Sequence, residues 1–174
     1  MYAAPECGGP FKAVEEYPNA WGSAAYVWSA ISAKLFGSES YWLTAVARDD
    51  HKSKEFWDSW KDPRLSEVEK ITFMFTFDAA LVRREHFRRL ATIFREFVKL
   101  HPAPGRACSL PKQADRLDIL ASEQHGLDFT PAFVGWQQTS VSENPWRVRT
   151  GEDEGRSYDV SKDSKHFFLF DEVI

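Results

Sequence analysis

The segment REHFRRLATIFREFVKL, residues 84–100, carries the clearest structural signal in this chain. Its apolar side chains recur every three or four residues, which places them along one side of an α-helix. These side chains are Phe87, Leu90, Ala91, Phe94, Phe97 and Val98. The sequence HPAPG at residues 101–105 ends the helix, because proline lacks the backbone N–H and clashes with the preceding turn. A helix with one apolar side must pack against other elements, so this segment predicts a domain built around it.

The same helix carries a line of cations beside its apolar side, called here the basic stripe. Arg84, Arg88, Arg95 and Lys99 fall within about 60° of one another at about 100° per residue. Four cations on one line can bind phosphates or an acidic protein partner. The alternative is a solvated face on which neighbouring glutamates neutralise part of the charge.

The sequence on either side of this segment predicts further helices. Residues 19–35 place apolar side chains at helical spacing, and Gly37 stands where a glycine C-cap belongs. Phe56, Trp57 and Trp60 form an apolar patch on a short amphipathic turn, either in the core or on a partner surface. Pro111 opens a helix that runs to about residue 124. We therefore expect four to five helices within residues 11–126.

Residues 66–81 contain two conflicting signals. Ser66 and Glu69 match the S-x-x-E capping box at the start of a helix, which predicts a helix running toward Leu81. The sequence ITFMFTF, residues 71–77, also alternates with period two and is typical of a strand. The capping box favours the helix, and a strand over residues 70–78 is the alternative.

After residue 126 the pattern changes to short alternating segments, which predict antiparallel strands. We expect strands near residues 133–139, 146–149, 158–160 and 166–170, joined as a small meander. Residues 1–10, rich in Pro and Gly, predict an irregular arm. The 174 residues suit one domain. The predicted fold is thus a single α+β domain, with helices over residues 11–126 packed on a C-terminal antiparallel β-meander over 127–174.

The sequence WQQTSVSENPW, residues 136–146, is a second candidate site. It is dense in amides and hydroxyls, which make directional hydrogen bonds, and it is bracketed by tryptophans, which offer large contact areas. This mixture is typical of a recognition hairpin, and an ordinary strand and turn with core tryptophans is the alternative. The candidate contact residues are Trp136, Gln137, Gln138, Asn144 and Trp146.

Composition indicates an ordinary globular protein with an excess of aromatic residues. The aromatic share of 15%, with seven Trp, fits either a large core or a Trp-rich contact surface. The net charge of −4 argues against a surface devoted to nucleic acid. The apolar stretches are shorter than the roughly 18 residues of a membrane helix, and no signal peptide is recognisable. We therefore expect a cytoplasmic protein without membrane contact.

The sequence contains no motif of a known catalytic or cofactor chemistry. The five histidines form neither H-E-x-x-H nor a helical i, i+4 pair, and phosphate loops and the G-x-S-x-G elbow are missing. Cys7 and Cys108 are expected to be free thiols, with one long-range disulfide as the alternative. We accordingly predict no metal, no cofactor and no catalytic residue.

The small, acidic, Trp-rich profile is similar to that of bacterial toxin immunity proteins, a likeness of profile and not of motif. It implies a non-enzymatic cytoplasmic module that binds a partner protein and inhibits it by occlusion. Residues 136–146 and the basic stripe would form its contact surface. Two other hypotheses are a nucleic-acid-associated protein that uses the basic stripe and an enzyme of unrecognised type.

Overall fold

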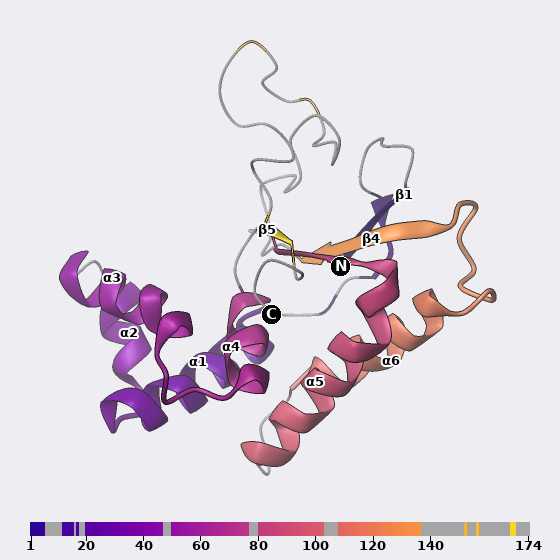
Figure 1. Cartoon of the computed structure of the whole chain (residues 1–174). Coiled ribbons are helices and arrows are strands. Elements are labelled where there is room, and N and C mark those ends of the chain that lie inside the picture. Colours follow the sequence, from indigo (N-terminus) through magenta and orange to yellow (C-terminus); the bar gives the residue numbers. More distant parts are fainter. Residues whose placement is uncertain are drawn as a thin grey trace.

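A computed structural model of the chain describes residues 1–5, 12–15, 17, 20–46, 50–76, 80–102, 108–136, 152, 156 and 168–169. Within these residues, six α-helices and five short strands form an α+β domain, which confirms the predicted class. The sheet lies above the paired helices α5 and α6, and α1 to α4 group beside them (Figure 1).

The sheet takes its strands from distant parts of the chain. Its order is β2 (Lys12–Ala13), β1 (Tyr2–Pro5), β4 (Pro131–Trp136), β3 (Ala80–Arg83) and β5 (Phe168–Leu169). Neighbouring strands are antiparallel except β3 and β5, which are parallel. The described sheet therefore differs from a meander of consecutive C-terminal strands, because β4 pairs with β1 and β3. The strands expected at 146–149 and 158–160 lie outside the described residues.

The prediction of an irregular arm is wrong for Tyr2–Pro5. β1 lies between β2 and β4, and the side chains of Ala3 and Ala4 are fully buried. Its register against β4 shifts between Ala4 and Pro5, where the proline ends the regular pairing. A four-residue strand with two alanines has weak β-propensity, so its neighbours in the sheet decide its structure.

Both faces of the neighbouring strands β3 and β4 are buried. Val82, Val134 and Trp136 belong to the same core as the helices. The side chains of Leu81 and Phe133 alternate with them and are 0% and 8% exposed.

The helices before β3 pack around one tryptophan. They are α1 (Ala20–Phe36), α2 (Tyr41–Val46), α3 (Asp50–Trp57) with the 3-10 turn η1 (Asp58–Lys61), and α4 (Glu67–Met74). The ring of Trp28 on α1 lies 5.3 Å from that of Trp42 and 5.4 Å from that of Trp57. Phe56 is fully buried, and Trp57 and Trp60 are half-buried against the core. The apolar patch of the third helix therefore packs inward.

Two predicted helix ends are confirmed. Gly37 follows α1 with a φ of 72°, a left-handed conformation that favours glycine. At the start of α4, the Ser66 hydroxyl accepts from the Glu69 backbone, and the Glu69 carboxylate accepts from the Ser66 backbone. The capping box thus forms, and the predicted helix is confirmed over Glu67–Met74, although it stops well before Leu81.

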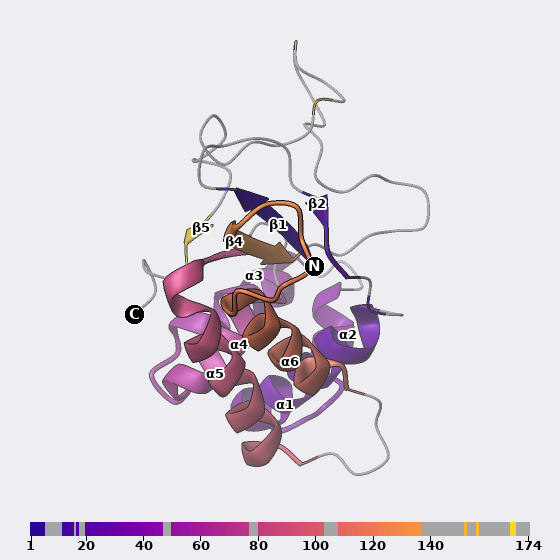
Figure 2. The same cartoon turned by 90° about the vertical axis from the view of Figure 1, so that its right-hand side faces the viewer.

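The helix expected over 84–100 is present as α5 (Phe87–Leu100), preceded by the 3-10 turn η2 (Arg84–His86). Phe87, Leu90 and Phe97 are 0% exposed, as the periodicity predicted. α6 (Leu110–Ala121) runs beside α5, beneath the sheet (Figure 2). No described helix is long and apolar enough to cross a membrane.

We expect Thr72→Val to raise the free energy of unfolding by about 1 kcal/mol, measured by urea denaturation. Thr72 is 1% exposed, and within the described part of the chain its hydroxyl has no hydrogen-bond partner. Valine keeps the shape and removes the buried hydroxyl. Thr92→Val is the matched control, because Thr92 is exposed and bonds the Arg88 carbonyl on its own helix. A destabilised Thr72→Val protein would contradict this account.

Candidate functional site

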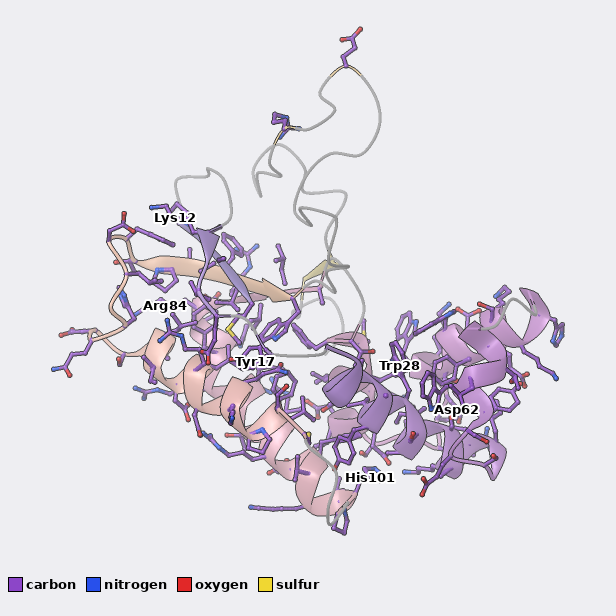
Figure 3. All side chains as sticks on the ribbon, turned by 180° about the vertical axis from the view of Figure 1, so that it is seen from behind. Lys12, Tyr17, Trp28, Asp62, Arg84 and His101 are labelled. Atoms are coloured by element: carbon purple, nitrogen blue, oxygen red, sulfur yellow. The ribbon has the colours of Figure 1, made fainter. Side chains whose placement is uncertain are left out.

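Arg84, the first cation of the basic stripe, makes its hydrogen bonds within the protein. The guanidinium of Arg84 donates to the carbonyls of Leu120 at 2.9 Å, Ala121 at 3.3 Å and Ser122 at 3.1 Å. It also donates to the carbonyl of Pro131 at the start of β4, at 3.3 Å. The last carbonyls of a helix lack partners within the helix and carry partial negative charge. Arg84 therefore caps α6 and joins it to β4, between the sheet and the helices (Figure 3).

The third cation of the stripe is also engaged. Arg95 donates to the carboxylates of Asp115 and Asp118 on α6, at 2.7 Å each. These two hydrogen bonds raise the pKa of Arg95 above its ordinary value. Two carboxylates thus surround one guanidinium, so this part of the stripe has no excess of positive charge.

The remaining stripe residues, Arg88 and Lys99, are exposed on α5. The exposed stripe residues therefore belong to a surface of mixed charge along α5 and α6, called here the α5–α6 face. Its residues are Arg88, Thr92, Arg95, Glu96, Lys99, Asp115, Asp118 and Ile119. It carries charges of both signs, and Ile119 is an exposed apolar side chain, at 44%. A phosphate backbone is uniformly negative and favours a surface with an excess of cations, whereas a protein partner offers charges of both signs.

Trp136, the first residue of the predicted recognition hairpin, lies in the core. It is 8% exposed, and its indole N–H donates to the side-chain oxygen of Gln113 on α6 at 2.8 Å. Its ring lies 5.1 Å from that of Phe75 and 5.9 Å from that of Phe94. The structure thus places Trp136 in the alternative, structural role. Gln137, Gln138, Asn144 and Trp146 lie outside the described residues.

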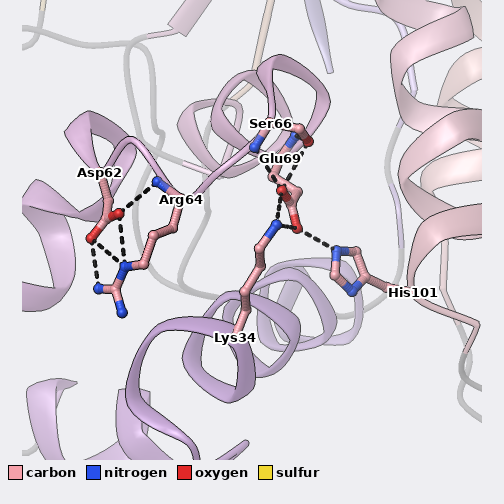
Figure 4. A network of polar contacts seen from close by, with 6 residues as sticks. All are labelled: Lys34, Asp62, Arg64, Ser66, Glu69 and His101. Carbon is pink, nitrogen blue, oxygen red and sulfur yellow. Dashed lines mark hydrogen bonds and ion pairs between the residues drawn. The ribbon is translucent and has the colours of Figure 1, made fainter.

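A buried carboxylate lies at the centre of a polar cluster, called here the Glu69 junction. Glu69 is 2% exposed and accepts from the Lys34 ammonium at 2.6 and 2.8 Å. The backbone N–H and hydroxyl of Ser66 donate to it at 2.7 and 2.8 Å. Nε2 of His101 lies 3.0 Å from Oε1 of Glu69. The cluster joins α1, α4 and the end of α5 (Figure 4).

The electrostatics of the Glu69 junction favour the ionised carboxylate. Burial raises the pKa of Glu69, but the hydrogen bonds from Lys34, Ser66 and His101 together outweigh burial and hold the pKa below its ordinary value. A carboxylate offers about four acceptor positions, and the five contacts from these residues occupy them. The geometry is that of a structural anchor and leaves no oxygen of Glu69 open to a substrate.

Sequence reasoning identified only part of this cluster. The capping box predicted the contact between Ser66 and Glu69, because it depends on a spacing of three residues. Lys34 and His101 lie 35 and 32 residues from Glu69, and no local spacing rule relates them. Tertiary packing alone brings these two side chains to the carboxylate.

The described residues include no group of three His, Cys, Asp or Glu side chains that could hold a metal ion. Cys108 is half-buried. Cys7, the other cysteine of the chain, lies outside the described residues.

Arg84→Lys is expected to lower the free energy of unfolding by about 2 kcal/mol, since one ammonium cannot span four carbonyls on two elements. Arg88→Lys is the matched control on the exposed side of α5, with an expected change within about 0.5 kcal/mol. Chemical denaturation measures both. Equal effects of the two substitutions would show that Arg84 is not a cap.

Replacing Trp136 by alanine removes a core ring and its bond to Gln113, so we expect a loss of about 3–5 kcal/mol in the free energy of unfolding. Thermal and urea denaturation measure this loss. A stable Trp136→Ala protein would return Trp136 to the candidate contact residues.

Comparison of the chain with protein-family models, with curated proteins and with solved structures gave no match. The geometry of the α5–α6 face and of the Glu69 junction is therefore the basis for a functional assignment.

Proposed function

We propose that this protein is a non-enzymatic cytoplasmic binding module that inhibits a partner protein by occluding part of its surface. The contact surface would be the α5–α6 face; residues 137–146, the other candidate from the sequence, lie outside the described residues. The observation that carries the proposal is the pairing of Arg95 with Asp115 and Asp118, which fixes both signs of charge in one place.

The α5–α6 face is suited to protein recognition because the charges of Arg95, Asp115 and Asp118 are held before a partner arrives. Arg95 is locked by two ion pairs at 2.7 Å, and Arg84 secures the end of α6. Side chains that are ordered in advance lose less entropy on binding. Fixed charges of both signs select a complementary partner and set the register of the complex. Ile119 supplies apolar area within this charged surface.

The competing nucleic-acid hypothesis loses part of its support from the same contacts. It required Arg84, Arg88, Arg95 and Lys99 as one line of cations. Arg84 bonds helix carbonyls and Arg95 bonds two carboxylates, so Arg88 and Lys99 remain as its exposed cations. The charges of the α5–α6 face favour a protein partner.

The test is an affinity pull-down from native cytosol with the tagged protein at about 150 mM salt, where loose surface charge attractions are screened. We expect one stoichiometric protein partner that is also recovered after nuclease treatment. The double variant Arg88→Glu/Lys99→Glu reverses two exposed charges and should reduce recovery at least tenfold, because like charges then face the partner.

The control variant, Lys52→Glu/Lys54→Glu, makes the same change of charge on α3 and should recover the partner like the unmodified protein. Equal recovery with both double variants would refute the α5–α6 face as the contact surface. Recovery that disappears with nuclease would instead support the nucleic-acid hypothesis.

A further inference from the structure

We propose that the Glu69 junction is an acid-sensitive latch. When its carboxylate is protonated, α1 and α4 separate from the end of α5 before the α5–α6 pair and the sheet lose their structure. The proposal is independent of the binding function, since none of the junction residues belongs to the α5–α6 face.

The contacts of the Glu69 junction span the seam between two parts of the domain. Lys34 lies near the end of α1, Ser66 and Glu69 begin α4, and His101 follows α5. The backbone of His101 is held from α1 as well, because its carbonyl accepts from the Tyr26 hydroxyl. One carboxylate thus connects all three helices, and its oxygens lie inside the protein.

The charged groups around Glu69 give the latch its direction. Lys34 from α1 and His101 from the end of α5 contact the carboxylate directly. The other charged groups on these elements have other roles or positions. On α4, Glu67 pairs with Arg89 of α5, and Lys70 is half-buried. Before α4, Arg64 pairs with Asp62. On α5, Lys99 is exposed. Two donors that carry or can carry positive charge therefore depend on one negative charge.

Protonation removes the charge that these donors share. The pKa of Glu69 lies below its ordinary value of 4.5 in the folded protein, so its contribution to stability is present above pH 4.5. That contribution is lost as the pH falls from 4.5 through the lower, folded value. A protonated Glu69 cannot pair with the Lys34 ammonium, which then lies beside a buried neutral group.

The other half of the domain depends less on carboxylates, because its ion pairs, such as that of Lys12 with Asp128, lie at the surface. α5 and α6 meet through fully buried apolar residues, including Leu90, Leu117 and Leu120. The Arg95 ion pairs with α6 are partly exposed and contribute little through surface charge alone. Acid therefore acts first where α1 and α4 meet α5.

Hydrogen exchange followed by mass spectrometry, corrected for intrinsic exchange rates, tests the latch between about pH 7 and about pH 3. We expect peptides from α1 and α4 to lose protection at a higher pH than peptides from α5 and α6. Lys34→Gln removes the ammonium and should move this opening upward by about one pH unit, because the carboxylate loses its opposite charge.

Lys99→Gln is the matched control, since it removes one exposed ammonium from the last turn of α5 and should leave the opening at its original pH. Glu69→Gln should abolish the acid dependence of the opening, and Lys34→Gln decides the question if that buried variant does not fold. An opening that Lys34→Gln and Lys99→Gln shift equally would overturn the latch. So would simultaneous loss of protection in all helices of the unmodified protein.

Discussion

The rest of the structure depends on how α5 buries its apolar side. Phe87, Leu90 and Phe97 are fully enclosed, so α5 must be covered by α6, α4 and the sheet at once. The polar residues along its edges then make the contacts that this enclosure requires. Arg89 reaches Glu67 on α4 at 2.5 Å, and Arg95 reaches α6. A helix that is amphipathic in the sequence thus becomes the element to which the others attach.

Local signals predicted the elements, and long-range contacts escaped prediction. The periodicity of α5, the capping box of α4 and the glycine after α1 each depend on residues within a few positions of one another. β1 was missed because Ala3 and Ala4 have little preference for a strand until β2 and β4 flank them. The order of the sheet joins strands that are far apart in the sequence, so no local pattern specifies it.

The candidate site in the structure differs from the one predicted from the sequence for the same reason. The sequence places Arg84 and Arg95 on one helical line with Arg88, whereas Arg84 lies in η2, before α5 begins. What it cannot specify is which carbonyls and carboxylates come within reach when α6 packs beside α5. These partners convert a line of cations into a capped helix and a surface of mixed charge. The Glu69 junction arises in the same way, from donors on two other elements.

The order of the sheet also governs when the protein can fold during its synthesis on the ribosome. α1 to α4 connect residues that are close in the chain, so they can form while later residues are still being made. β4 at residues 131–136 lies between β1 and β3, which therefore stay without their common neighbour until most of the chain has emerged. During that interval the backbone groups of residues 2–5 and 80–83 lack their partners in β4, so wrong pairing is a hazard mainly before residues 131–136 emerge.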